Sequence, residues 1–237
     1  MTLEGKLALI TGGSLGIGFA IAQALADEGC NLIVCGRGQE KLEHVQKKLS
    51  VTGTQVAAFT CDVRDAVSVR KMFAAIGQKH TNLDILVNSA GIAHPMRSTA
   101  ELSPEEWNDV LATNLTGTFL VCQAALPLMQ CGATIVNILS MSPKRVFPNL
   151  AAYNASKFRA LGFTSTLREE LRQQGIRVIA ALPGSTDTPI WDSLWPDAPR
   201  EKMLRAETVA ESIVAALKLP PESTVEELAI MPTGGPL

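Results

Sequence analysis

A tyrosine and a lysine four residues apart form the pair of side chains in this sequence best suited to acid–base chemistry. Tyr153 is the only tyrosine among the 237 residues. If the segment after Pro148 is helical, Tyr153 and Lys157 share one helical face, about one turn apart. A nearby ammonium stabilises a phenolate and lowers the phenol pKa from its ordinary value of about 10. The spacing predicts a proton donor and acceptor of lowered pKa, although an ordinary helical tyrosine beside an exposed lysine fits it equally.

Alternating strands and helices are needed to position this pair, and the chain begins with such a unit. The apolar run 6–11 suits a buried parallel strand and leads directly into a glycine-rich turn. A helix with one apolar stripe follows and ends near Gly29. In such a turn the backbone amides can approach a pyrophosphate, which then lies at the positive end of the helix dipole. The turn residues are Gly12, Gly13, Ser14, Leu15, Gly16, Ile17 and Gly18.

The same alternation continues along the chain and predicts a single α/β domain over residues 1–237. Right-handed crossovers place helices on both faces of such a sheet, so we expect a doubly wound parallel sheet of about seven strands. The predicted helix 118–130 has almost no polar face, which indicates burial on two sides and leaves room for a partner subunit. Further strands are expected at 31–36, 55–61, 84–88, 133–139, 176–182 and 227–231, and further helices at 39–50, 65–79, from a capped start at Ser103, at 150–174 and around 209–217.

The composition argues against several classes of partner. With a formal charge of −2 and scattered lysines and arginines, the chain has no basic region suited to nucleic acid or to a membrane surface. The five cysteines lack Cys-x-x-Cys spacing, which favours reduced thiols in the cytoplasm. The three histidines lack metal-ligand spacing, so no metal site is expected. No apolar run reaches the ~18 residues of a membrane span and no signal-peptide pattern is present, which predicts a soluble, untargeted protein.

Several motifs occur together and in a fixed order along the chain. They are Thr-Gly-x-x-x-Gly-x-Gly at 11–18, Asp62-Val63, Asn-x-Ala-Gly at 88–91, Asn114, Ser140, Tyr153-x-x-x-Lys157, and Pro183-Gly184 with Thr188. In this combination the chain closely resembles the short-chain dehydrogenase/reductase family from residue 6 to about residue 190. The resemblance implies a Rossmann fold and an enzyme that moves hydride between a nicotinamide and a ketone or secondary alcohol.

The resemblance also implies a role for each catalytic residue. Tyr153 would donate a proton to the carbonyl oxygen during reduction, or accept one from the alcohol during oxidation. Ser140 would hydrogen-bond the same oxygen, and Lys157 would lower the phenol pKa and bind the nicotinamide ribose. Asn114 would anchor a proton-relay water, although a helix kink or cap is an alternative explanation for this residue.

The residues after the second strand bear on the choice of cofactor. Gly36 stands about where NAD-specific members have an aspartate, and Arg37 follows it, which predicts a preference for NADP(H) over NAD(H) through the 2′-phosphate. A solvated loop arginine is the alternative. Leu15 occupies a position where some NADP-preferring relatives have a basic residue. The cofactor-binding residues implied by the resemblance are Gly12, Ser14, Leu15, Gly16, Ile17, Gly18, Arg37, Asp62, Val63, Asn88, Ala90, Gly91, Tyr153, Lys157, Pro183, Gly184, Thr186 and Thr188.

The sequence departs from the family pattern at four places. Ser89 replaces the second asparagine of Asn-Asn-Ala-Gly, which weakens a central hydrogen bond more than the chemistry. Leu139 replaces a serine that many members carry, and Pro143 replaces a frequent glycine, so the loop on the substrate side is stiffer. The chain after Met231 lacks the Asp-Gly-Gly ending of many members.

Three interpretations of the function follow. The first is an NADP(H)-dependent oxidoreductase acting on a ketone or secondary alcohol, as a homo-oligomer (dimer or tetramer) in the cytoplasm. The second is a non-catalytic NADP(H)-binding sensor or scaffold protein, but such proteins commonly lose the tyrosine or the lysine. The third is a nucleotide-sugar epimerase or dehydratase of the related longer-chain group, against which the chain length and glycine spacing count.

The residues that could contact the substrate indicate less about function than the residues of the catalytic and cofactor motifs. Residues from about 188 to 205 contain three prolines and two tryptophans and predict a mobile cover over the substrate, while a static loop packed by Trp191 and Trp195 is the alternative. Steroids, acyl thioesters, sugars and small ketones all stay possible as substrates. Candidates for an apolar pocket, each equally explained by packing, are His94, Met141, Ser142, Val146, Phe147, Ile190, Trp191, Leu194 and Trp195.

Overall fold

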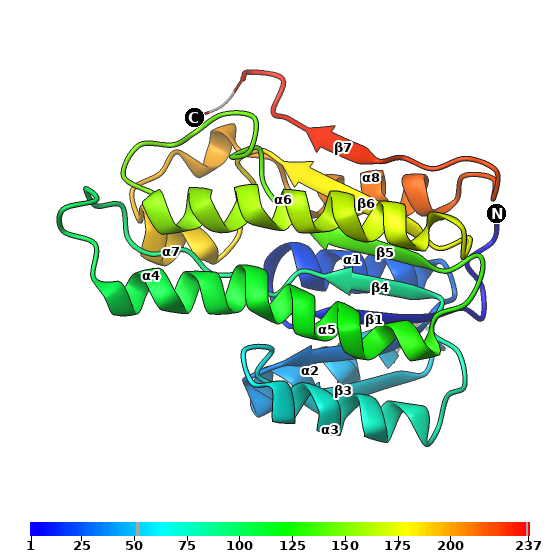
Figure 1. Ribbon diagram of the computed structural model, residues 1–237. Helices are drawn as coiled ribbons and strands as arrows, with labels where there is room; N and C mark the ends of the chain where they lie inside the picture. Colours follow the sequence, from blue (N-terminus) through cyan, green and yellow to red (C-terminus); the bar gives the residue numbers. More distant parts are fainter. Residues whose placement is uncertain (51–52, 236) are drawn as a thin grey trace.

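Seven parallel strands form one twisted sheet in the computed structural model, which describes residues 1–50, 53–235 and 237 (Figure 1). The strand order is β3-β2-β1-β4-β5-β6-β7, so the winding reverses between β1 and β4. This order confirms the predicted doubly wound Rossmann sheet, in which ligands bind beyond the carboxyl ends of the strands. The strands are β1 (Leu7–Thr11), β2 (Asn31–Gly36), β3 (Val56–Thr60), β4 (Ile85–Asn88), β5 (Thr134–Ile138), β6 (Arg177–Pro183) and β7 (Glu227–Ile230).

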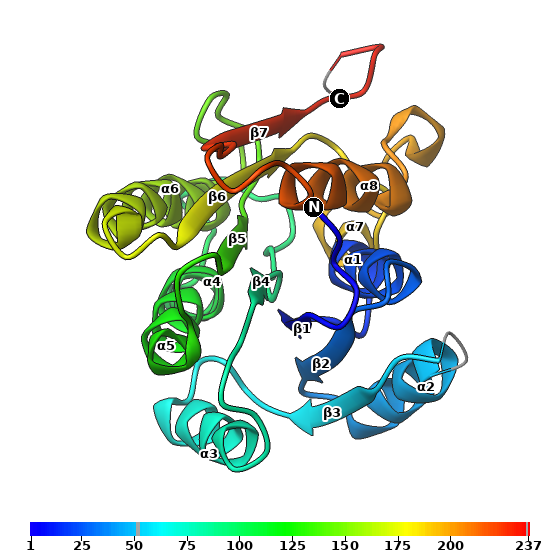
Figure 2. The same cartoon turned by 90° about the vertical axis from the view of Figure 1, so that its right-hand side faces the viewer.

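Helices cover both faces of the sheet, as the end view shows (Figure 2). Helices α1, α2 and α8 lie on one face, and α3, α5 and α6 lie on the other. The helices are α1 (Gly16–Asp27), α2 (Gln39–Leu49), α3 (Ala66–Gly77), α4 (Pro104–Leu111), α5 (Gly117–Ala125), α6 (Ala151–Arg172), α7 (Ile190–Leu194) and α8 (Ala206–Leu217).

The strands supply two hydrophobic cores because each strand is covered on both sides. Ile10 and Val34 are fully buried on the side of α1, α2 and α8. Leu9 and Ile33, their neighbours in sequence, are fully buried on the opposite side. Each such side chain stabilises the fold by about 1.5–3 kcal/mol relative to exposure. The continuous apolar runs of the strands follow from this double burial, and they fix the strand ends from which the functional loops leave.

The predicted helix 118–130 corresponds to α5 and the turn after it, but it is not a separate helix. A single helical segment runs from α4 through a π-helical turn at Ala112–Thr116 into α5, and a short 3-10 turn ends it at Leu128. Gly117 permits this course, since a Cβ there would lie 2.7 Å from a methyl carbon of Val63. The segment Pro104–Leu128 is long and apolar enough to cross a membrane, but Val121 and Cys122 are buried against the sheet, as in the core helix of a globular protein.

The start of α4 follows the predicted capping pattern. The Ser103 hydroxyl accepts a hydrogen bond from the Glu106 amide at 3.1 Å, and the Glu106 carboxylate accepts one from the Ser103 amide at 3.3 Å. This reciprocal pair satisfies two amide groups that would otherwise lack partners at the helix start. The cap fixes where α4 begins, and thereby the position of the π-helical turn two turns later.

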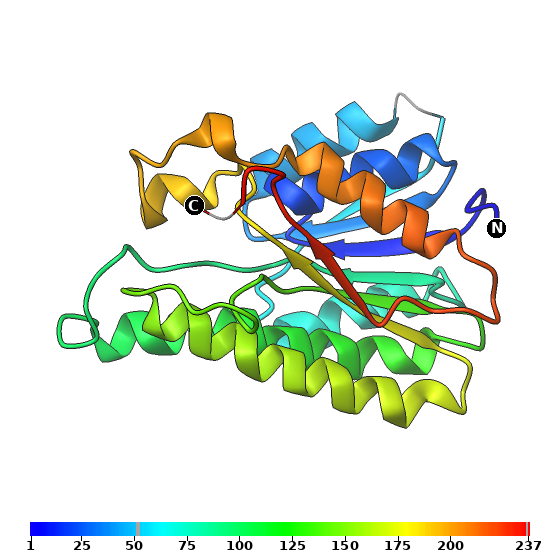
Figure 3. The same ribbon diagram turned by 90° about the horizontal axis from the view of Figure 1, so that it is seen from above.

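The loops after β1 to β6 leave the sheet at its carboxyl edge, and α7 lies beyond that edge (Figure 3). The glycine-rich turn, the loop after β5 and the first turns of α6 meet there as well (Figure 1). Residues from six separate loops are therefore brought to one side of the domain.

Candidate active site

A cavity of about 790 Å³ opens at the carboxyl ends of the strands. It brings together the predicted site residues except Gly18, Asn88 and Asn114, which lie behind its wall. The described residues contain no group of three His, Cys, Asp or Glu side chains placed to hold a metal ion. The predicted residues that line the cavity are Gly12, Ser14, Leu15, Gly16, Ile17, Arg37, Asp62, Val63, Ala90, Gly91, Ser140, Tyr153, Lys157, Pro183, Gly184, Thr186 and Thr188.

The glycine-rich turn is shaped by backbone contacts that exclude side chains. Gly12 has a φ of 64°, and a Cβ there would lie 2.9 Å from the Cα of Ala90. A Cβ on Gly18 would lie 2.4 Å from the Gly12 carbonyl oxygen, so this glycine is needed for packing although it does not face the cavity. The Thr11 hydroxyl accepts hydrogen bonds from the amides of Ser89 and Ala90, both at 3.1 Å. The turn is thus held against the loop after β4, with an open concave backbone that suits a phosphate group.

Tyr153 and Lys157 lie in the first two turns of α6 and both face the cavity. The Lys157 ammonium is 5.6 Å from the centre of the Tyr153 ring and donates a hydrogen bond to the Ile138 carbonyl at 3.0 Å. The Ser140 hydroxyl, two residues after the end of β5, accepts a hydrogen bond from the Ser142 amide at 3.1 Å. The structure therefore places a phenol, a hydroxyl and an ammonium together on one wall, as the sequence predicts.

The predicted lowering of the Tyr153 pKa is wrong for this structure. Part of the Tyr153 side chain is reached from the cavity, but its withdrawal from bulk water raises the phenol pKa, and a hydrogen bond with Ser140 only partly offsets this. Burial also lowers the pKa of the Lys157 ammonium to about 8, since only 6% of the residue is exposed. The cost of removing each charge from water exceeds the attraction between them, because the ammonium lies beside the ring and its hydrogen bond goes to a backbone carbonyl.

Asn114 lies in the π-helical turn between α4 and α5. Its side-chain oxygen accepts a hydrogen bond from the Ile92 amide at 2.8 Å, and its amide nitrogen donates to the Ile92 carbonyl at 2.9 Å and to the Ser156 hydroxyl at 3.0 Å. A Cβ on Gly91 would lie 3.4 Å from the Asn114 oxygen and 3.7 Å from the Lys157 nitrogen. The π-helical turn agrees with the helix irregularity that the sequence offered as one explanation for Asn114, and the role of Asn114 in anchoring a proton-relay water stays a prediction.

Asn88 connects strands instead of facing the cavity. Its side-chain nitrogen donates to the Asn137 side-chain oxygen on β5 at 2.9 Å and contacts the Cys122 sulfur at 3.2 Å. The neighbouring Ser89 lines the cavity, although the motif analysis assigned it no cofactor contact. The side chain at 88 therefore holds β4 against β5, and residues 89–91 form the cavity wall.

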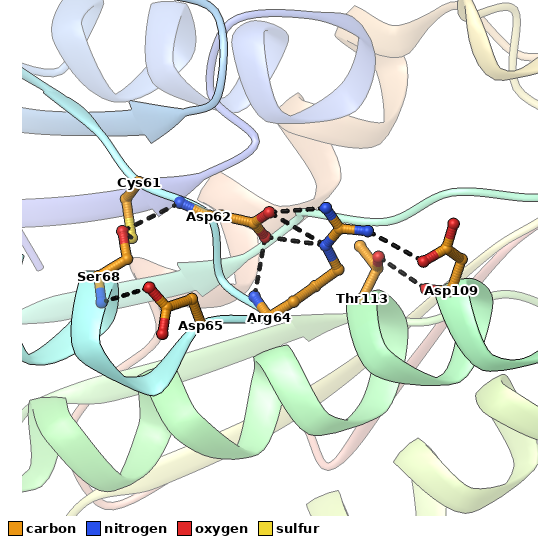
Figure 4. A network of polar contacts seen from close by, with 7 residues as sticks. All are labelled: Cys61, Asp62, Arg64, Asp65, Ser68, Asp109 and Thr113. Atoms are coloured by element: carbon orange, nitrogen blue, oxygen red, sulfur yellow. Dashed lines mark hydrogen bonds and ion pairs between the residues drawn. The ribbon is translucent and has the colours of Figure 1, made fainter.

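Arg64 is a cavity-lining residue that sequence reasoning missed (Figure 4). Its guanidinium donates to the Asp62 carboxylate from Nε at 3.1 Å and from Nη2 at 2.7 Å, and to the Asp109 carboxylate from Nη1 at 3.0 Å. The hydrogen bonds from Arg64 hold the pKa of the Asp62 carboxyl below its ordinary value, with a smaller contribution from the charge of Arg37. The hydroxyl of Thr113 donates to the Asp109 carbonyl at 2.8 Å. Arg64 thereby links the loop after β3 to α4, one turn before Asn114.

A second missed arginine organises the segment after β6. Arg200 donates to the carboxylates of Asp187 and Asp192, both at 2.7 Å, and to the Thr188 carbonyl at 3.0 Å. It therefore ties the loop that carries Thr188 to α7. The only sequence signal for Arg64 was its place two residues after Asp62, and Arg200 had none, because partners of an isolated arginine are set by the fold.

The candidates for an apolar pocket divide into two groups. Phe147, Ile190, Trp191, Leu194 and Trp195 line the cavity, whereas His94, Met141, Ser142 and Val146 do not. Leu139, at one of the departures from the family pattern, also lines it. The backbone of Leu194 accepts a hydrogen bond from the Met96 amide at 3.1 Å, which joins α7 to the loop after β4.

The fold and this constellation define the class of the protein. The sequence profile of the family described as short chain dehydrogenase matches residues 6–199, and the chain belongs to this family. It is therefore an oxidoreductase with a Rossmann fold, as the motifs predicted.

Relatives of known name illustrate the range of the family. The chain is 36% identical to a 3beta-hydroxysteroid dehydrogenase of Mediterraneibacter gnavus over 186 residues, covering 78% of this chain and 67% of that protein. It is 38% identical to a D-threitol dehydrogenase of Mycolicibacterium smegmatis over 205 residues, covering 86% of this chain and 78% of that protein. Among solved structures, a single-substitution variant of actinorhodin polyketide ketoreductase with NADPH has a TM-score of 0.86 at 34% identity, covering 98% of this chain and 97% of that one.

Proposed function

We propose that the protein is an NADP(H)-dependent oxidoreductase that interconverts a ketone and a secondary alcohol, with Tyr153 as the proton donor and acceptor. The observation that carries this proposal is the placement of Tyr153, Ser140 and Lys157 on one wall of a cavity whose other end is the glycine-rich turn. A non-catalytic sensor would have no need for this complete group of side chains.

The cavity fits a dinucleotide on observations of this chain alone. Gly12 and Gly16 have positive φ angles, and side chains there would fill the concave turn against Ala90 and Thr188. Asp62 and Val63 line the cavity after β3, where the adenine is expected, and Lys157 lines it from α6, where the nicotinamide ribose is expected. When bound, the nicotinamide supplies or accepts the hydride.

The side chains of the protein handle the proton. The Tyr153 phenol, whose pKa is raised by burial, can donate to a carbonyl oxygen that gains negative charge during reduction. The Ser140 hydroxyl can hydrogen-bond the same oxygen and hold it in place. The Lys157 ammonium stabilises the phenolate that forms when the proton leaves, and Asn114 positions the backbone of Ile92 beside this group.

Arg37 is proposed to contact the 2′-phosphate of NADP(H). We expect Arg37→Ala to raise the Kd for NADPH about 10–100-fold and the Kd for NADH less than about 3-fold, because a charge-assisted hydrogen bond to the phosphate is lost only with NADPH. Fluorescence titration of both cofactors measures the effect. Arg70→Ala removes an exposed arginine of α3 outside the cavity and serves as the control. Equal losses for the two cofactors would contradict the assignment.

The proposed activity is tested by incubating the purified protein with NADPH and a panel of ketones and following the loss of NADPH absorbance. We expect turnover with at least one ketone, and slower turnover with NADH in place of NADPH. NADPH binding without turnover on any ketone or secondary alcohol would instead support the non-catalytic sensor.

The surroundings of the site complete the proposal. We propose that residues from about 188 to 205 cover the bound substrate. The contact of Leu194 with Met96 supports this proposal.

We also propose that the protein forms a homo-oligomer, because Phe119 on α5 and Phe158 on α6 expose 42% and 46% of their surface on one helical layer. All five cysteines are free, which is consistent with a reducing cytoplasm.

A further inference from the structure

The charged side chains of the cavity are unevenly distributed. Arg37, Asp62 and Arg64 follow β2 and β3, at the end proposed to hold the adenosine. The one other charged side chain among the described lining residues is Lys157, which belongs to the catalytic group. The wall beyond Tyr153, formed by the loops after β4 and β5 and by α7, offers no charge to a substrate.

The polar groups of this wall are already engaged with the protein itself. The Trp191 indole nitrogen donates to the Thr186 carbonyl at 2.8 Å, and the Ser193 hydroxyl donates to the Ile190 carbonyl at 3.2 Å. Both groups therefore already donate their hydrogen to a protein carbonyl, and neither has a hydrogen left to donate to a substrate. The side chains that form the wall are Met96, Phe147, Pro148, Trp191, Leu194 and Trp195.

Apolar surface continues from the wall to the solvent. Met96 is 42% exposed and Trp195 is 38% exposed, and both line the cavity. The rings of Trp191 and Trp195 lie 6.5 Å apart at an angle of 56°, one inside the cavity wall and the other toward its mouth. Exposed apolar groups that adjoin a cavity are typical of a site for an apolar ligand.

We propose that the substrate is an uncharged ketone, or the corresponding alcohol, whose carbonyl is attached to a bulky hydrocarbon body. This inference rests on the proposed function. A substrate hydroxyl buried against this wall would lose its water partners and find the donors of Trp191 and Ser193 already engaged, and a carboxylate would lose far more. The hydrocarbon body gains from every part of its surface that the wall removes from water. The site thus suits ring ketones such as decalones and disfavours polyols, sugars and keto acids.

The charge part of the proposal is tested with acetophenone and 4-acetylbenzoate, which differ only by a carboxylate. With NADPH as reductant, we expect kcat/KM to be at least about 100-fold higher for acetophenone, because the carboxylate must be desolvated. Trp195→Lys places an ammonium at the mouth and is expected to reduce this ratio at least about 10-fold. Val146→Lys is the matched control, since Val146 is 64% exposed and lies outside the cavity lining, and it should leave the ratio unchanged.

A binding measurement keeps the inference testable without turnover. Calorimetric titration of the NADPH-saturated protein with 2-decalol and with D-threitol compares an apolar and a polar alcohol under conditions in which neither can be oxidised. We expect the Kd for 2-decalol to be at least about 100-fold lower. A comparable or tighter affinity for threitol, or equal kcat/KM for the two acetophenones, would overturn the proposed substrate class. Absence of turnover with a retained preference for decalol would instead contradict only the proposed function.

Discussion

Tyr153→Phe is expected to lower kcat for ketone reduction by about 10²–10⁴-fold while the Kd for NADPH stays nearly unchanged. The variant keeps the ring and its packing but removes the proton that the carbonyl oxygen must gain, and general acid catalysis contributes about this much. Burial raises the phenol pKa and so favours the protonated form that reduction requires. Reduction should therefore vary little between about pH 6 and 9 through this group, whereas alcohol oxidation, which needs the phenolate, should rise with pH.

The unusual composition of the chain allows a direct check of this prediction. Tyr153 is the sole tyrosine, so ultraviolet titration follows one phenol, and Tyr153→Phe supplies the blank. In the cofactor-free protein we expect a midpoint above the ordinary value of about 10. Ser140→Ala should raise the midpoint further, since the hydrogen bond with Ser140 acts to lower it. A Tyr153→Phe enzyme that keeps more than about one tenth of its kcat would remove Tyr153 from the proposed role.

The sequence predicted the fold well because the relevant signals are local and repeated. Buried parallel strands require apolar runs such as 6–11, and the turn after β1 requires Gly12 at a positive φ against Ala90. Parallel strand order then brings the loop ends to one edge of the sheet. For this reason Ser140, which follows β5, could be expected at this edge, whereas its place beside Tyr153 on α6 was implied by the family resemblance.

The features that the sequence did not reveal depend on contacts between segments that are far apart in the sequence. The π-helical turn around Asn114 leaves no mark in the apolar pattern, so the helix through it was divided incorrectly. One partner of Arg64, the Asp109 carboxylate, comes from α4, 45 residues further along the chain, and no spacing rule predicts such a pair. The prediction that the Tyr153 pKa would be lowered failed for a related reason. Spacing gives the nearness of Lys157, but the balance between charge attraction and lost hydration depends on how deeply both groups are buried.

The buried ammonium of Lys157 lowers the stability of the folded protein, so a role in catalysis explains its presence better than a role in folding. With 6% exposure and a hydrogen bond only to the Ile138 carbonyl, it lacks a carboxylate partner within the described contacts. Its pKa falls from 10.5 to about 8, which corresponds to a penalty of about 3 kcal/mol for holding the charge in the folded protein. Functional sites commonly retain such unfavourable groups at the expense of stability.

Lys157→Met should therefore stabilise the protein while it abolishes most of the activity. At pH 7 the lysine is charged in both the folded and the unfolded chain. Its removal therefore relieves the folded protein of the full penalty, but it also removes a hydrogen bond that contributes about 1 kcal/mol to the free energy of unfolding. We expect Tm to rise by about 4–8 °C. Between about pH 8 and 10.5 the unfolded chain binds the proton more tightly than the folded protein, so wild-type stability rises with pH relative to the variant and the difference closes. Thermal unfolding across this pH range measures it, with Lys47→Met on the exposed face of α2 as the control. A variant less stable than wild type at pH 7 would mean that Lys157 supports the fold as well as the chemistry.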